Sequence, residues 1–84
     1  MKYTVIWLKA AEDLLADLWT QAEDRNAVAA AADRIDEMLR HDPGALGESR
    51  SDKSRILFEG VLAVLFELSE PDRKVFVTAV KRCR

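Results

Sequence analysis

The C-terminal third of this chain is a succession of short apolar runs separated by turn residues. Ser54–Glu59, Val61–Leu68 and Arg73–Lys81 have the length and the β-branched content of strands. Gly60 supplies a tight turn after the first run, and Ser69–Asp72 supplies a turn before the last. Short turns of this kind join neighbouring antiparallel strands, so these residues predict a three-stranded meander.

The N-terminal half begins with another alternating run, Lys2–Leu8, and then changes to a helical period. Asp24 or Asn26 is a suitable N-cap for the second of two predicted helices, and Asp42-Pro43-Gly44 ends it. The apolar stripes of the two helices are Ala11, Leu14, Leu15, Leu18, Trp19 and Ala22, then Val28, Ala31, Ala32, Ile35, Met38 and Leu39.

The element order β-α-α-β-β-β predicts a two-layer α+β fold. We expect one domain over residues 1–84, with a helical hairpin packed on one face of a small, mainly antiparallel sheet of four strands. Each helix should be about 12–17 residues long, and Gly44–Asp52 should be a loop. The pattern leaves the place of the first strand open. The expected core includes both tryptophans, Trp7 and Trp19, together with Leu14, Leu18, Ile35, Leu39, Leu57, Val64 and Phe66.

The central run Val61–Leu68 is apolar on both of its alternating faces. A helical hairpin from a chain of this length covers one face of the sheet, so the second face needs another cover. Three covers are open: loop residues such as Ala45 and Leu46, a second copy of the chain in a homodimer, or a segment of a partner protein.

Charge divides the chain into two unlike halves. The 84 residues carry a net charge of −2, but residues 1–49 hold five basic and ten acidic side chains, whereas residues 50–84 hold eight basic and five acidic ones. A basic half fits an anionic partner, and it equally fits a solvated surface attracted to the acidic half. The candidate partner-binding residues are Arg50, Lys53, Arg55, Lys81 and Arg82.

Composition limits the remaining function classes. One cysteine, Cys83, excludes an internal disulfide, and no apolar run approaches the roughly 20 residues of a membrane span. The N-terminus lacks the layout of a signal peptide, so a cytoplasmic protein is expected. Phosphate-binding glycine loops and metal-ligand spacings are absent from the sequence, which predicts no cofactor and no metal. The single histidine, His41, is expected to be a helix-end residue.

Order and spacing over the whole chain resemble the RelE/ParE superfamily of toxins from bacterial type II toxin–antitoxin systems. The matching features are Pro43 and Gly44 after the second helix, then Arg55, Leu57 and Gly60 in the first hairpin. Val64-Leu65-Phe66 and Val80-Lys81-Arg82 complete the match. The resemblance implies a β-α-α-β-β-β fold and a cognate antitoxin encoded by a neighbouring gene.

The residues that depart from the RelE pattern select among the functions of this superfamily. RelE-like members cut mRNA on the ribosome, and their central strand commonly carries Arg three places before an aromatic residue. Here those positions are Ala63 and Phe66, Lys81 stands where His often precedes the terminal Arg, and no Tyr follows Arg82.

The resemblance therefore implies a ParE-like, plasmid-stabilisation-type toxin that acts by binding protein, with DNA gyrase as a possible target. Two alternatives stay open. A RelE-like ribosome-dependent mRNA endonuclease would use Arg55, Lys81 and Arg82 as its cationic residues. A degenerate, non-toxic member of the superfamily would act as a binding module.

Overall fold

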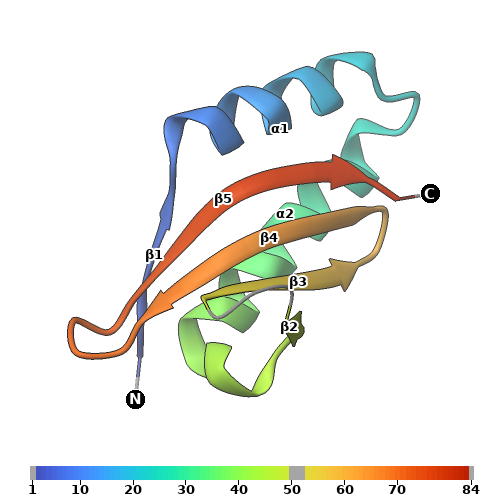
Figure 1. Cartoon of the computed structure of the whole chain (residues 1–84). Helices are drawn as coiled ribbons and strands as arrows, with labels where there is room; N and C mark the ends of the chain where they lie inside the picture. The colour runs from blue at the N-terminus through green and yellow to red at the C-terminus, as the bar shows by residue number, and fades with distance from the viewer. Residues whose placement is uncertain (1, 50–52, 84) are drawn as a thin grey trace.

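The chain folds into two helices and a five-stranded sheet in a computed structural model that describes residues 2–49 and 53–83 (Figure 1). The elements in chain order are β1 (Thr4–Trp7), α1 (Lys9–Gln21), α2 (Arg25–His41), the 3-10 turn η1 (Pro43–Ala45), β2 (Glu48–Ser49), β3 (Ser54–Glu59), β4 (Leu62–Ser69) and β5 (Lys74–Arg82). The predicted α+β fold is confirmed, and the helices of 13 and 17 residues have the expected lengths.

The strand order in the sheet is β1-β5-β4-β3-β2. β3, β4 and β5 form the predicted antiparallel meander, and β1 joins its edge by pairing parallel with β5. The prediction of four strands was wrong, because part of the expected loop pairs with β3 as the fifth strand. Gly47, at φ +73°, turns the chain there into its pairing position beside β3.

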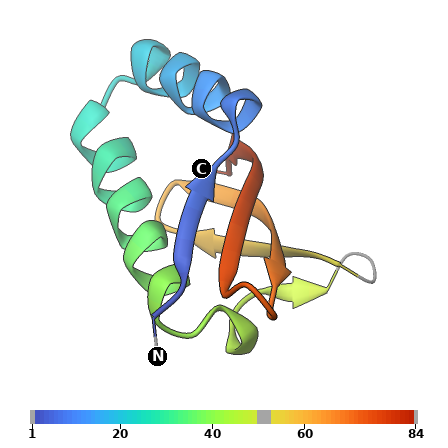
Figure 2. The ribbon, with the colours of Figure 1, turned by 90° about the vertical axis from the view of Figure 1, so that its left-hand side faces the viewer.

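The two helices form the second layer (Figure 2). The Asp24 side chain caps α2 by accepting a hydrogen bond from the Ala27 N–H at 3.0 Å, as one of the two sequence alternatives predicted. α2 lies behind the sheet in the view of Figure 1, whereas α1 lies along β5 at the upper margin of the sheet. Within the described ranges, neither helix has the length and apolar character needed to cross a membrane.

The core lies between α2, α1 and one face of the sheet. Ile35, Leu39, Leu57, Val64 and Phe66 are buried as predicted, and Leu18 packs against this core while staying partly exposed. The buried set that forms the core cluster is Ala11, Val28, Ala31, Ile35, Leu39, Leu57, Leu62, Val64, Phe66, Val75, Val77 and Val80.

Two predicted core residues of α1 were placed on the wrong side. Leu14 is 42% exposed, because Ala11, Leu15 and Leu18 already form the stripe that meets the core. Trp19 is 44% exposed at the end of the helix, where the Arg25 guanidinium carbon lies 4.5 Å from its ring centroid. Trp7, in contrast, packs against the core with part of its ring exposed.

A β-bulge in β5 changes which residues of that strand point inward. Phe66 of β4 pairs with Val77, while the preceding residue, Leu65, pairs with Ala79, so Thr78 is an extra residue in the ladder. Before the bulge Val75 and Val77 are buried; after it the buried residue is Val80. The shift by one position turns the side chain of Lys81 to the face of the sheet opposite the helices.

Candidate functional site

The face of the sheet turned away from the helices is built from alternate residues of β3, β4 and β5, and we call it the open face. It faces the viewer in Figure 1, with α2 behind it. Cross-strand pairing places its residues in three rows, which are Phe58–Ala63–Lys81, Ile56–Leu65–Ala79 and Ser54–Glu67–Phe76. Because paired residues on adjacent strands project to the same side, each row is one line of contacting side chains.

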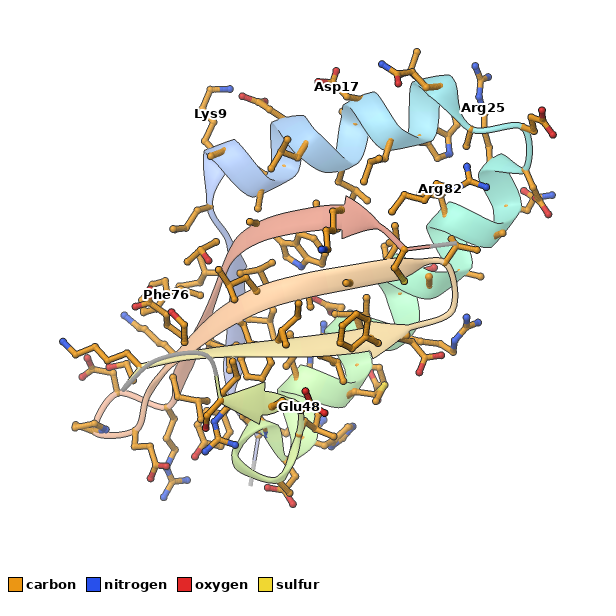
Figure 3. All side chains as sticks on the ribbon, turned by 45° about the vertical axis from the view of Figure 1, so that its right-hand side comes forward. Lys9, Asp17, Arg25, Glu48, Phe76 and Arg82 are labelled. Carbon is orange, nitrogen blue, oxygen red and sulfur yellow. The ribbon has the colours of Figure 1, made fainter. Side chains whose placement is uncertain are left out.

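Most of the open face is apolar. Phe58 is 51% exposed, and a hollow of about 230 Å³ lies between the strands. The residues lining this hollow are Ile56, Ala63, Leu65, Ala79, Val80 and Lys81. In Figure 3, Phe76 lies towards the start of β5, and the pairing with β4 places Ala79 and then Lys81 further along the same face. The prediction that the central strand is apolar on both faces is confirmed by this arrangement.

The described part of the segment after α2 packs towards the helix side of the sheet. Leu46 packs against the core cluster on the helix side of the sheet. The Arg55 Nη1 atom donates hydrogen bonds to the carbonyl oxygens of Gly44 at 2.8 Å and Leu46 at 3.3 Å. Arg55 pairs with the buried Phe66 and thus projects towards the helix side, where it holds this loop in place. Of the loop residues considered as a cover from the sequence, Leu46 is therefore excluded, because it lies on the helix side.

Four of the five basic residues predicted to bind a partner are described by the structure, and these four do not gather at one place. Lys81 lies on the open face beside its hollow, whereas Arg55 is directed to the helix side. Arg82 comes two residues after the buried Val80 and therefore projects to the helix side of the sheet. It is exposed at the end of β5, next to the helical hairpin in Figure 3. Lys53 is exposed just before β3, and Arg50 lies outside the described residues. A binding role for these residues stays a prediction.

The histidine and the tyrosine, two residue types that often transfer protons in catalysis, lie away from the open face. The only tyrosine, Tyr3, packs against the core. The only histidine, His41, ends α2, and its Nε2 lies 2.6 Å from Glu37 Oε1. This contact, with the charge on His41, lowers the pKa of the Glu37 carboxyl. Among the described residues, no cluster of three or more His, Cys, Asp or Glu side chains could hold a metal ion.

Sequence reasoning named the charged residues and missed the apolar ones that make up most of the open face. Ile56, Phe58, Phe76 and Ala79 were assigned no role, although they alternate with buried neighbours. The signal available for β3 was its period of two, which places Ile56 and Phe58 together opposite Leu57. In β5 the two faces cannot be assigned from a period of two, because the bulge interrupts the alternation after Val77.

The fold is shared with solved structures of toxin–antitoxin complexes. A chain of the RelBE2 complex from Mycobacterium tuberculosis superposes with a TM-score of 0.82 at 19% sequence identity, over 99% of this chain and 100% of that one. A chain of the chromosomal ParDE system from P. aeruginosa has a TM-score of 0.70 at 13% identity, over 99% and 98% of the two chains.

A chain of the archaeal RelE–RelB complex from Pyrococcus horikoshii OT3 also has a TM-score of 0.70 at 13% identity, covering 98% of this chain and 96% of that one. No protein-family model and no curated protein sequence matches the chain. The predicted RelE/ParE-like fold is thus confirmed, and it is shared by complexes of both the RelE and the ParE type.

Proposed function

We propose that this chain, with its RelE/ParE-like fold, is the toxin of a type II toxin–antitoxin pair and acts by binding protein, as ParE-like toxins do. The apolar open face carries the proposal. Phe58 is half exposed, and Ile56 and Leu65 line the hollow beside it; an apolar surface of this kind on a small domain is typical of a protein-binding site. The similarity to chains from three toxin–antitoxin complexes supports an antitoxin as the partner.

The chemistry of the open face indicates what kind of segment it binds. Its rows of apolar side chains fit the leucines of an extended or helical peptide. Lys81 stands beside the hollow, and Lys74 extends the same face at the start of β5. Glu67 also lies on this face, so the apolar rows favour a leucine-containing antitoxin segment, encoded by a neighbouring gene, whose acidic residues pair with Lys74 and Lys81.

Ribonuclease activity is the alternative that the described residues support least. Cleavage of RNA through its 2′-hydroxyl needs one group to take a proton and another to donate one. The ionisable residues of the open face are Lys74, Lys81 and Glu67, joined by Glu48 of β2 through its pairing with Ile56, while the one histidine and the one tyrosine lie away from it. This distribution favours action by binding, with DNA gyrase as a candidate target, over cutting of mRNA on the ribosome.

The test compares the affinity of the neighbouring gene product for the unaltered protein with its affinity for the Leu65→Lys variant, both measured by titration calorimetry. Leu65 lies in the middle row of the open face, so a charge there should weaken binding by at least tenfold. Leu14→Lys is the matched control, because it makes the same change at an exposed residue of α1 and should leave affinity within about twofold. Equal losses in both variants, or no binding by the unaltered protein, would contradict the proposal.

The salt dependence of the association rate, measured kinetically with the same two proteins, provides a second test. Attraction between the basic residues and an acidic segment should raise the association rate at low ionic strength. Lys81→Glu should reduce that rate and flatten its salt dependence, with a smaller effect on dissociation. Lys81 is the suitable position, because replacing Arg55 would also release the loop carbonyls that it binds.

A further inference from the structure

A second hollow lies on the helix side of the molecule, between α1 and α2 and next to the end of β1. Its volume is about 390 Å³, and it opens broadly to solvent. We call it the helix groove; it is lined by Trp7, Glu12, Leu15, Ala16, Ala32, Asp33 and Asp36. None of these residues contributes to the open face, so the helix groove is an independent surface.

The floor of the helix groove is apolar and shallow. Leu15 and the small side chains of Ala16 and Ala32 leave room between the two helices. The ring of Trp7 is partly exposed and lines the groove at its β1 end, with its indole N–H donating to Asp36 Oδ1 at 3.3 Å. A long, flexible side chain can bury its methylene groups on such a floor.

The rim carries carboxylates, and two of them are not paired with any other described residue. Asp36 is paired with Arg40 and hydrogen-bonded to Trp7. Glu12 on α1 and Asp33 on α2, in contrast, have no side-chain hydrogen bond or ion pair with any other described residue. Two unpaired carboxylates from different helices thus line one apolar groove with an aromatic ring.

These three features together select an arginine side chain as the occupant. Arginine has an apolar stem for the floor, a guanidinium that two carboxylates can bind, and a planar cation that stacks on an indole ring. Lysine has a compact, strongly hydrated cation and fits the ring less well. The groove spans about one helical turn on each side, from Glu12 to Ala16 and from Ala32 to Asp36, which suits one anchoring side chain.

We propose that the helix groove docks a basic, amphipathic helical segment of a partner protein through one arginine anchor. The net charge of −5 over residues 1–49 attracts such a segment, while the basic C-terminal half attracts an acidic one. The chain thus offers two docking surfaces of opposite preference. This inference does not rest on the toxin function, because it depends on the groove alone.

The experiment uses Trp7 as its reporter. Trp19→Phe removes the only other tryptophan, which lies outside the groove. The probe is a synthetic 16-residue amphipathic helix of leucine and alanine with a central arginine, and two further peptides carry lysine or glutamine in its place. The arginine peptide should change the Trp7 fluorescence saturably, bind more tightly than the lysine peptide, and bind at least tenfold more tightly than the glutamine peptide.

Paired charge variants show whether the rim is responsible. Glu12→Gln with Asp33→Asn should weaken arginine-peptide binding about tenfold. The matched control, Asp17→Asn with Glu23→Gln, removes the same charge from exposed residues that do not line the groove, and should change affinity less than twofold. Circular dichroism checks that all variants fold alike, and amide shifts should map binding to α1 and α2.

Several results would overturn the proposal. These are the absence of saturable binding, equal affinity of the glutamine peptide, equal losses in the two charge variants, or amide shifts confined to the sheet. Free arginine or spermine binding as tightly as the peptide would make the groove a small-cation site instead. Dimerisation of the protein at the working concentration, abolished by the rim variant, would assign the groove to a second copy of the chain.

Discussion

Gly44 and Gly47 stand close together in the segment after α2 but have different surroundings. A Cβ atom on Gly47 would lie 2.6 Å from the Ile56 carbonyl oxygen and 3.2 Å from a ring carbon of Phe66, and its φ is +73°. At Gly44 nothing lies within 4 Å of the added atom. The approach of Gly47 to β3 is what allows β2 to pair with that strand and Arg55 to reach the loop carbonyls.

We therefore expect Gly47→Ala to lower the free energy of unfolding by about 1–3 kcal/mol, through the left-handed φ and the clash with backbone. Gly44→Ala is the matched control and should change it by less than about 0.5 kcal/mol. Urea denaturation of both variants measures the difference. Equal stability of the two would mean that the segment moves away from β3 without cost.

Leu39 and Leu14 form a second matched pair, because one is fully buried and the other is 42% exposed. Leu39→Ala leaves a cavity in the core and should lower the free energy of unfolding by about 2–5 kcal/mol. Leu14→Ala should cost less than about 1 kcal/mol, since it removes little buried area and alanine has the higher helix propensity. Urea denaturation also tests this pair, and a large effect of Leu14→Ala would show that its outer side is covered in solution.

At the scale of the element, the C-terminal end of α2 is held by a cluster of charged side chains. His41 contacts Glu37 one turn earlier, and Arg40 bridges Asp36 and Glu37. The basic side chains of Arg40 and His41 also lie in the last turn of α2, where the negative end of the helix dipole favours positive charge. The cluster lowers the pKa of the Glu37 carboxyl below its usual 4.5, chiefly through the hydrogen bond with His41 and then through the charge on His41.

The lowered pKa of Glu37 makes the stability of the folded state depend on pH. The folded state favours ionised Glu37 more than the unfolded state does, so the contribution is fully present above the usual carboxyl pKa of 4.5 and is lost as pH falls through the lowered value. His41→Ala should raise the pKa of Glu37 towards 4.5, as measured by NMR titration of its carboxyl carbon. Arg25→Ala, at the opposite end of α2, should leave that pKa unchanged. A Glu37 pKa insensitive to His41→Ala would assign the shift to other charges.

Among the individual elements, β1 has the greatest influence on how the others are arranged, through its pairing with β5. Val5 and Trp7 pair with Val75 and Val77, which brings the two ends of the chain into one sheet. The Leu8 N–H also donates to the Val77 carbonyl oxygen at 3.0 Å, directly before α1 begins. This junction positions α1 along β5 and places Trp7 at the end of the helix groove.

At the scale of the whole molecule, the two layers separate two surfaces of different chemistry. The open face is mostly apolar and carries Lys74, Lys81 and Glu67, whereas the helix groove has carboxylates at its rim. A partner that engaged both would need an acidic apolar segment and a basic one. One long wrapping chain could supply both, and so could two separate proteins.

The residue types on the open face predict the outcome of an mRNA cleavage assay. Expression of the chain in cells, followed by mapping of mRNA 5′ ends, should produce no new cuts within translated codons, because the open face has no histidine or tyrosine to transfer protons. A RelE-type ribonuclease expressed in parallel is the positive control. Abundant codon-positioned cuts that disappear in Lys81→Ala would instead establish the ribonuclease alternative.

Local periods in the amino-acid sequence determined the elements of this protein. The 3.6-residue stripes gave two helices of the observed lengths, Asp24 marked the start of α2, and Gly60 marked the first hairpin turn. The meander and the two-faced apolar character of β4 were also readable, because neighbouring residues carry the whole signal. The RelE/ParE-like fold could be inferred from this order of elements and its spacing.

Tertiary structure alone decided where these elements meet. The parallel pairing of β1 depends on contacts between residues far apart in the chain, such as Thr4 and Lys74. The fifth strand and the bulge at Thr78 depend on the register between neighbouring strands. Those contacts directed Arg55 to a structural role and left Lys81 on the open face. They also brought Glu12, Asp33 and Trp7 together in one groove. A sequence pattern records which face a residue takes within its own element, but not which other element lies opposite that face.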